Sequence, residues 1–508
     1  MKHFWRYLCA LMTNFVLTKN ALFIHKNCIM ENSDNKGFYK LNWLQRIGFG
    51  SGDLAQNLIY QTISIWLLFY YTNIFGINPG DASIMFLVVR LVDVLWDPVV
   101  GTFIDKHNPK LGKYRSYLVF AGIPLTGFAI LCFWNGLAHC EYTYKLIYCY
   151  VTYVTLSMLY TLINVPYGAL NSSLTRDTNE ITILTSVRMF MANFGGLCVS
   201  AGVPVLVAYF NGMVTAKDID TAIFMGLGSL PAFIFMPLVP AIKRALGKKG
   251  LLYSFLSIAI VGMAFLYVVA VMDSTRNNQT LINIAQFVKS SGVIVATGYM
   301  WALIPEVISY SEWKTGKRIS GIVNALTGIF FKAGMALGGV IPGAVLWMVG
   351  YNVAEQAEQA AVIDDAVAAS WFNAILIYSL TGLALLIFCF SQCKERVVMD
   401  SKEAENVKVS DLWLEFVKNR PLRVIAFFFI TAFAMMSVGN AAGPYFKAEQ
   451  AHLALPEMQW QGILAILCVI PSILLLLAMF IISRYELDDA RVDEINREIE
   501  ARNKGNNI

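Results

Sequence analysis

Residues 251–272 read LLYSFLSIAIVGMAFLYVVAVM, a run of 22 residues without a charged side chain. An α-helix rises about 1.5 Å per residue, so this run covers about 33 Å as a helix. The hydrocarbon core of a bilayer is about 30 Å thick. The stretch therefore predicts a helix that spans a membrane.

Eleven further stretches have a similar length and apolar character, and the chain lacks the short alternating strands of a membrane β-barrel. Only 14% of the 508 residues are charged, against about a quarter in soluble proteins. We therefore predict an all-α polytopic membrane protein with 12 transmembrane helices. The predicted spans are residues 43–72, 83–105, 116–136, 146–170, 182–210, 221–241, 251–272, 281–309, 321–349, 371–391, 422–446 and 460–484.

The loops between these spans differ in charge. One set of loops carries nineteen Lys and Arg residues, whereas the opposite set carries four, which are Lys145, Lys217, Arg276 and Lys447. Cytoplasmic loops are enriched in Lys and Arg, so the asymmetry predicts that both termini are cytoplasmic. An even number of spans agrees with this orientation.

The two ends of the chain lie outside the predicted spans. Residues 1–42 form a lead-in without a signal-peptide cleavage pattern, and either Met1 or Met30 is the true start. The charged tail at 485–508 predicts a solvated cytoplasmic helix, and it has no basic stripe for nucleic acid. The nine cysteines show no metal-type spacing, which predicts reduced, buried thiols.

The second span, FLVVRLVDVLWDPVVGTFIDKH at residues 86–107, holds Arg90, Asp93 and Asp97 in an apolar context. A carboxylate at mid-membrane costs about 2.5–3.5 kcal/mol on insertion scales. The two aspartates are four residues apart and share one helix face. One arginine does not balance two acids, so we predict a site for Na⁺ or a proton. The alternative is that the acids only neutralise buried bases.

Two basic residues also lie within predicted spans. Lys332 is central in the ninth span and needs a buried partner, for which the aspartate pair is the natural candidate. Arg188 lies nearer the cytoplasmic end of the fifth span, where extension to the interface is a strong alternative. We interpret both as site residues.

Amide and aromatic residues on three spans suit a sugar, which is bound by hydrogen bonds to its hydroxyls and by aromatic stacking. The alternative interpretation is polar contact between helices. These candidates are Asn57, Tyr60, Tyr160, Asn164 and Trp301. Turns that combine Gly with basic residues follow the second and sixth spans, as in transporters with two related halves. We assign Arg90, Asp105, Arg115 and Arg318 to gating at the cytoplasmic side.

At these positions the chain resembles the glycoside–pentoside–hexuronide:cation symporters, the melibiose-permease branch of the major facilitator superfamily. The similar motifs are YYTNIFGI (70–77), VRLVDVLWDPVVGTFID (89–105), LGKYR (111–115), NVPYGALNSSLTRD (164–177), LTSVRM (184–189) and EVISYSEWKTGKRISGIVNALTGIFFKAG (306–334). The resemblance implies two six-helix bundles and alternating access.

The resemblance also implies residue roles. Its cation-site residues match Asp93, Asp97 and Thr161. Its sugar-site positions fall on Asn57, Tyr160, Asn164, Arg188 and Lys332. The chain departs from melibiose-type members at Asn57 and Asn164, where those have acids, and at Trp96 and Gly168. These departures leave the sugar and the coupling ion open.

The order of the segments along the chain also departs from that of the family. The words KERV (394–397) and NRPL (419–422), which in the family flank the linker between helices six and seven, follow the tenth span here. We therefore expect residues 43–210 to be family helices 1–5, 211–352 to resemble helices 8–11, 353–446 to resemble helix 6, linker and helix 7, and 447–484 to be the last helix. Each exchanged block has an even number of spans, so helix orientations are preserved.

The expected function is symport of a sugar, glycoside or uronide with Na⁺ or H⁺ across the cytoplasmic membrane, by a protein expected to be monomeric and without cofactors. A lysophospholipid symporter of the same superfamily is the alternative. A membrane sensor is a distant one, because the chain has no large soluble signalling domain. An intramembrane enzyme is disfavoured, since neither a nucleophile–base pair nor an HExxH motif is present.

Overall fold

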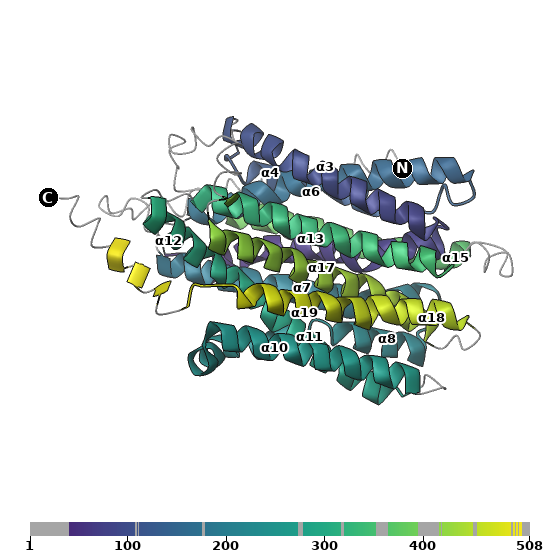
Figure 1. Ribbon diagram of the computed structural model, residues 1–508. Helices are drawn as coiled ribbons and strands as arrows, with labels where there is room; N and C mark the ends of the chain where they lie inside the picture. Colours follow the sequence, from purple (N-terminus) through teal and green to yellow (C-terminus); the bar gives the residue numbers. More distant parts are fainter. Residues whose placement is uncertain are drawn as a thin grey trace.

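The computed structural model describes residues 40–106, 109, 111–174, 178–272, 278–315, 320–351, 364–394, 416–417, 419–450, 455–488, 491–492, 494–495 and 497–499. Among these residues the regular structure is helical, without a β-strand. The helices lie roughly side by side along one direction (Figure 1). The prediction of an all-α fold is confirmed.

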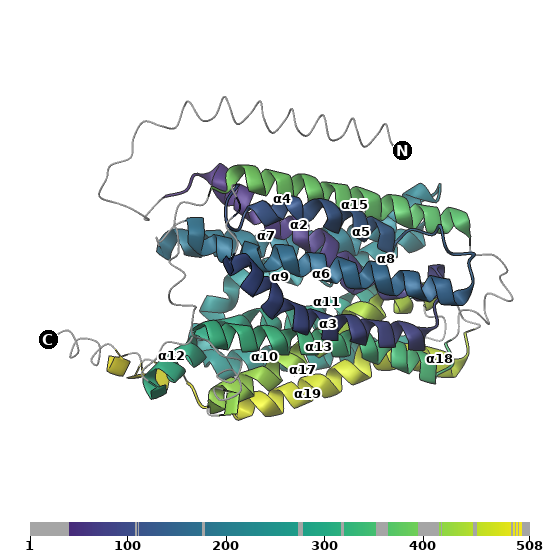
Figure 2. The ribbon, with the colours of Figure 1, turned by 90° about the horizontal axis from the view of Figure 1, so that it is seen from above.

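The first bundle is built mainly from the first half of the chain. Its elements are α2 (Trp43–Thr62), which continues through η1 (Ile63–Leu67) and η2 (Tyr70–Ile74), α3 (Pro79–Lys106), α4 (Ser116–Phe120), α5 (Gly122–Cys132), α6 (Tyr142–Leu174), α7 (Thr178–Phe210) and, from much later in the chain, α15 (Asp365–Gln392). Helix α15 packs on α2, α7 and α5. Figure 2 shows α15 beside α2 and α4, on the side of the molecule away from α17 and α19.

The second bundle takes up the remaining helices. Its elements are α8 (Ala216–Gly226), α9 (Pro231–Phe235), η3 (Met236–Leu238), α10 (Val239–Met272), α11 (Gln279–Met300), η4 (Trp301–Leu303), α12 (Ile304–Thr315), α13 (Ser320–Met348), α17 (Arg420–Glu449), α18 (Glu457–Leu464), η6 (Ala465–Val469) and α19 (Ile470–Ser483). The main packing pairs within it are α10 with α11, α13 with α17, and α17 with α19. The two bundles meet chiefly where α3 packs on α13 and α7 packs on α8.

All twelve predicted spans fall on these helices. Among the residues that the structure describes, eight helical stretches are long and apolar enough to cross a membrane, judged by length and composition, and one of them is the long stretch at Ala216–Met272. That long stretch contains two predicted spans, and it breaks at Gly247, whose φ of 69° leaves the helical region. Helices α2 and α3 carry ionisable residues, which lowers their mean hydropathy, and Ser116–Cys132 is shorter. The described residues of 491–499 are helical, as expected for the tail.

Glycines on two faces of α13 let it approach both bundles closely. A Cβ at Gly338 would lie 1.9 Å from the Cβ of Ser437 on α17. On another face, a Cβ at Gly343 would lie 1.9 Å from the Oγ of Ser83 on α3. Small residues permit such close contact between membrane helices, where dispersion contacts contribute much of the association. Helix α13 is therefore the main packing element between the bundles.

We expect Gly338→Ala to destabilise the protein, because the added methyl group overlaps Ser437. Overpacking of this kind costs about 1–3 kcal/mol. The matched control is Gly328→Ala on the same helix, where a Cβ meets no atom within 4 Å. The control is expected to be neutral or slightly stabilising, since Ala is the better helix former. Thermal unfolding in detergent measures both, and equal melting temperatures for the two variants would contradict this account of the α13–α17 contact.

Candidate functional site

Asp93 lies at the middle of α3, where two neighbours hold its carboxylate. The side chain of Arg90 donates to Oδ2 over 3.2 Å, and the hydroxyl of Ser157 on α6 donates to Oδ1 over 2.5 Å. The residue is only 2% exposed. A buried carboxylate needs this compensation, because its charge is poorly solvated inside the protein. Asp93 is therefore fixed in place by one charged and one neutral donor.

Asp97 lies one turn further along α3 and forms an ionic contact between the bundles. Its Oδ1 is 2.5 Å from the Nζ of Lys332 on α13. The Asp97 side chain is 32% exposed and that of Lys332 17%. The predicted pairing of Lys332 with the aspartates is thus confirmed for Asp97. Arg90 pairs with Asp93 and Lys332 with Asp97, so two bases balance the two acids. The charges of the second span alone did not show this balance, because Lys332 lies on another helix.

The predicted cation ligand Thr161 is buried on α6, one turn after Ser157. The two hydroxyls lie on the same face of this helix. Among the described residues, Asp93, Asp97, Ser157 and Thr161 supply carboxylate and hydroxyl oxygens, the ligand type that hard cations prefer. Trp96, between the aspartates in sequence, donates its indole N–H to the carbonyl of Met158 over 3.2 Å and so fixes α3 on α6.

Two predicted sugar-site tyrosines lie beside this charged cluster. Tyr60 on α2 stacks on Tyr160 of α6, with ring centroids 5.4 Å apart. The Tyr60 hydroxyl also contacts the sulfur of Met335 on α13. Tyr60 therefore joins both bundles at the level of the aspartates.

Arg188 on α7 forms an internal ion pair. Its guanidinium binds the carboxylate of Asp53 on α2 and lies over the ring of Tyr167, 4.8 Å from the centroid. The Tyr167 hydroxyl donates to the same carboxylate over 3.2 Å. Asn57 donates its amide to the backbone carbonyl of Asp53 over 3.0 Å. The alternative of an arginine that extends to the membrane interface is not what the geometry shows.

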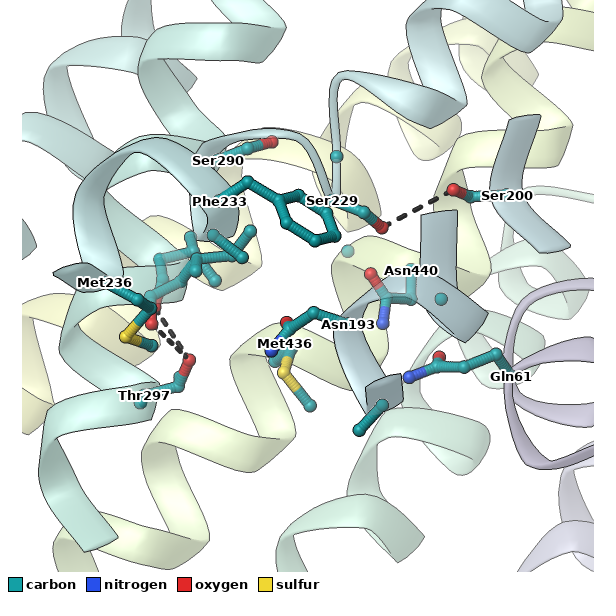
Figure 3. A pocket seen from close by; sticks show the side chains of 18 of the residues that line it. Gln61, Asn193, Ser200, Ser229, Phe233, Met236, Ser290, Thr297, Met436 and Asn440 are labelled. Atoms are coloured by element: carbon teal, nitrogen blue, oxygen red, sulfur yellow. Dashed lines mark hydrogen bonds between the residues drawn. The ribbon is translucent and has the colours of Figure 1, made fainter. Parts of the chain in front are cut away.

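A cavity of about 800 Å³ opens between the bundles (Figure 3). Figure 3 shows amides and hydroxyls from both bundles around it: Gln61 on α2, Asn193 and Ser200 on α7, Ser229, Thr297 on α11 and Asn440 on α17. The hydroxyls of Ser200 and Ser229 are 3.4 Å apart across the bundle interface. Phe233 and Trp301 contribute aromatic rings to the lining. A polyhydroxyl ligand fits such a mixture of neutral polar and aromatic groups.

The cavity contains some of the predicted site residues and not others. Asn57 and Trp301 line it. The other predicted ligands belong to the described part of the chain but are not in its lining; they are Tyr60, Asp93, Asp97, Tyr160, Thr161, Asn164, Arg188 and Lys332. Asn164 is exposed on α6. The predicted cation residues therefore form a cluster beside the cavity, and adjacent residues of α2, Tyr60 and Gln61, connect the two.

The structure describes the side chains of two of the four predicted gating residues, Arg115 and Arg90. Arg115 donates to the carbonyl of Cys393 over 3.3 Å and lies 5.0 Å from the ring centroid of Phe390, so it binds the end of α15. Arg90 serves Asp93. Asp105 lies in the last turn of α3, but its side chain is not among those described, and Arg318 lies outside the described residues.

Several residues of the site were missed by the sequence analysis. Ser157 carried a usable signal, because it precedes Thr161 by four residues on a helix already suspected of cation binding. The cavity residues Gln61, Asn193, Ser229 and Asn440 are isolated polar positions on separate helices. Their convergence depends on how the helices pack, which no local pattern reveals.

Comparison with known proteins supports this architecture. The sequence pattern of the family described as "MFS/sugar transport protein" matches residues 48–218, 205–369 and 361–467. The chain is 37% identical over 409 residues to the uncharacterized symporter YnaJ of Bacillus subtilis, covering 64% of this chain and 87% of that protein.

More distant relatives have named substrates. The isoprimeverose transporter of Lactiplantibacillus pentosus is 24% identical over 481 residues, covering 78% of this chain and 96% of the relative. The glucuronide carrier protein homolog of Escherichia coli is 25% identical over 406 residues, covering 64% and 87%. The family pattern extends over well more than half of the chain, as the resemblance implied. The chain is therefore a multi-pass membrane protein that belongs to the MFS/sugar transport protein family.

Proposed function

We propose that this protein carries a sugar, glycoside or uronide across the cytoplasmic membrane together with Na⁺ or H⁺, by alternating access. The observation that carries the proposal is a polar, aromatic-lined cavity between two bundles, beside a buried and a partly exposed carboxylate on one helix face. The names of the relatives, which include an isoprimeverose transporter and a glucuronide carrier protein homolog, support the choice of sugar as cargo.

The coupling cation is proposed to bind among Asp93, Asp97, Ser157 and Thr161. Asp97 is held by Lys332 in this structure, so a cation that binds there competes with the ammonium group. This contact joins α3 to α13, and its release weakens the ionic connection between the bundles. Cation binding and the relative position of the bundles are thereby linked.

The sugar is proposed to bind in the cavity, where Asn57 and Gln61 of α2 meet polar groups from the second bundle. Helix α2 also presents Tyr60 to the cation cluster. A cation that orders this part of α2 favours sugar binding, and linkage requires that sugar favours the cation equally.

The orientation follows from the loop charges: both termini are proposed to be cytoplasmic, and the protein is proposed to act as a monomer in the inner membrane. The end of the molecule at which α2 begins and α15 ends then faces the cytoplasm. Access alternates between this end and the opposite end of the cavity.

We also propose that the exchanged segments take their family positions with different connections. Three observations support this. Helix α15 packs on α2, α7 and α5, as helix six of an N-terminal bundle does. Arg115 binds the end of α15. The family pattern matches in three segments whose borders, 205–218 and 361–369, are close to the expected block borders.

Asp93→Asn and Asp97→Asn are each expected to abolish accumulation of sugar against a gradient, because an amide cannot compensate a bound cation. Uptake of labelled β-glycosides, xylosides and uronides into vesicles, with Na⁺ and pH varied separately, measures this. Glu141→Gln, which changes an exposed acid in a loop, is the control. Accumulation retained in either aspartate variant, at wild-type expression and melting temperature, would refute the cation site.

The position of α15 is tested by cross-linking. His139, between α5 and α6, contacts Asp365 at the start of α15 over 3.0 Å. A short bifunctional methanethiosulfonate is expected to join H139C to D365C in a background without native cysteines. The control pair combines D365C with M272C at the exposed end of α10 in the second bundle. Mass spectrometry identifies the joined peptides, and preferential joining of the control pair would place α15 in the other bundle.

A further inference from the structure

Lys289 of α11 is a buried base that lies in the wall of the cavity. It is 7% exposed. Among the described residues that line the cavity, it is the only ionisable one, and the other polar residues of the lining are neutral. No hydrogen bond or ion pair to its ammonium group is found within the described part of the chain. Its titratable neighbour is the thiol of Cys468, which supplies no fixed negative charge.

Most of the other interior bases in the described part of the chain have a carboxylate as counter-charge. Arg90 has Asp93, Arg188 has Asp53 and Lys332 has Asp97. Lys248 pairs with Glu306 over 2.8 Å. Two buried lysines outside the cavity lining have other surroundings: Lys447 donates to the amide oxygens of Gln279 and Gln450, and Lys145 lies over the ring of Phe75. Because a buried ammonium without a counter-charge is costly, Lys289 is expected to have a partner that is not part of the described chain.

The neighbours of Lys289 extend this group into a small polar site. Gln286 lies one turn earlier on α11, is 6% exposed, and its Oε1 has no hydrogen-bond partner among the described residues. Ser290 follows Lys289 and is also buried in the cavity wall. An ammonium, an amide and a hydroxyl together offer several donors to an anionic group and an acceptor to an adjacent hydroxyl.

The rigid packing beneath Lys289 supports a positioned site. A Cβ added at Gly262 of α10 would lie 2.3 Å from the backbone nitrogen of Lys289. The α10 backbone therefore lies directly against α11 at this residue and holds its main chain. The main chain that carries the ammonium group is therefore already positioned, which lowers the cost of ordering the site when a ligand binds.

We propose that the transported sugar is anionic, and that its carboxylate or sulfonate binds Lys289 with Gln286 and Ser290 alongside. This inference rests on the proposed sugar-binding role of the cavity and narrows it to one substrate class. A neutral glycoside in the same cavity would leave the ammonium group without a counter-charge.

Binding to the purified full-length protein in nanodiscs, measured by calorimetry, tests the inference. Three probes share one ring and differ at C6: methyl β-D-glucoside, methyl β-D-glucuronide and the corresponding 6-deoxy-6-sulfo glucoside. Wild-type protein is expected to bind at least one anionic probe about ten-fold or more tightly than the neutral one, since a charge-assisted hydrogen bond contributes that much. The two anionic arms distinguish a carboxylate from a sulfonate as the preferred group.

Lys289→Met is expected to remove this preference, with affinity for the anionic probe falling about ten-fold or more and affinity for the neutral probe unchanged. Lys289→Arg keeps the charge and is expected to keep part of the preference. The matched control is Lys145→Met, which removes a lysine of similar burial on α6, away from the cavity. Unchanged neutral-probe binding and melting temperature show that the variants are folded.

The outcomes separate this inference from the broader function. If the wild-type protein binds the neutral glycoside as tightly as both anionic probes, or if Lys289→Met keeps the preference, the inference is wrong and sugar transport stands. If no probe binds at millimolar concentration and none is taken up into vesicles, the proposed function fails together with it.

Discussion

The cost of placing charge in a membrane interior is the constraint on which this structure depends. Three acids, Asp53, Asp93 and Asp97, lie within helices that cross the molecule, and each is in contact with one base. Arg90 and Asp93 pair within α3, Arg188 and Asp53 join two helices of the first bundle, and Lys332 and Asp97 join the two bundles. Pairing with an opposite charge lowers the free-energy cost of a charged residue in the interior. The pair between Asp97 and Lys332 also fixes a point at which the bundles are in contact.

The contact between α3 and α13 combines this ionic pair with close backbone packing. Gly343 brings α13 against Ser83 near one end of α3, and Lys332 reaches Asp97 nearer the other. The first contact depends on shape and the second on charge. A ligand that changes the charge at Asp97 therefore alters one end of the interface and leaves the other intact. An interface with one persistent and one releasable contact can rock, which is the motion that alternating access requires.

The sequence was a good guide to what depends on local composition. Span positions followed from apolar length, and the partner of Lys332 followed from the high cost of leaving its charge unpaired. The aspartate pair was expected as the partner of Lys332, but which aspartate takes the lysine and which takes Arg90 depends on how α13 packs on α3, and no local pattern shows this. The position of Lys289 was missed for a related reason. A lysine within QFVKSSG near a predicted span end gives no sign that its neighbours are neutral, because those neighbours come from α10 and η6.

The two proposed sites have a joint electrostatic consequence. In the empty state the interior ion pairs are neutral and Lys289 adds one positive charge to the cavity. An anionic sugar with one cation adds no net charge, so the loaded and empty proteins carry the same charge through the membrane. A neutral sugar with one cation would move one charge, worth about 2.3 kcal/mol per 100 mV of membrane potential. With one cation per anion, the cation gradient alone drives uptake, and the membrane potential neither assists nor opposes the complete transport cycle.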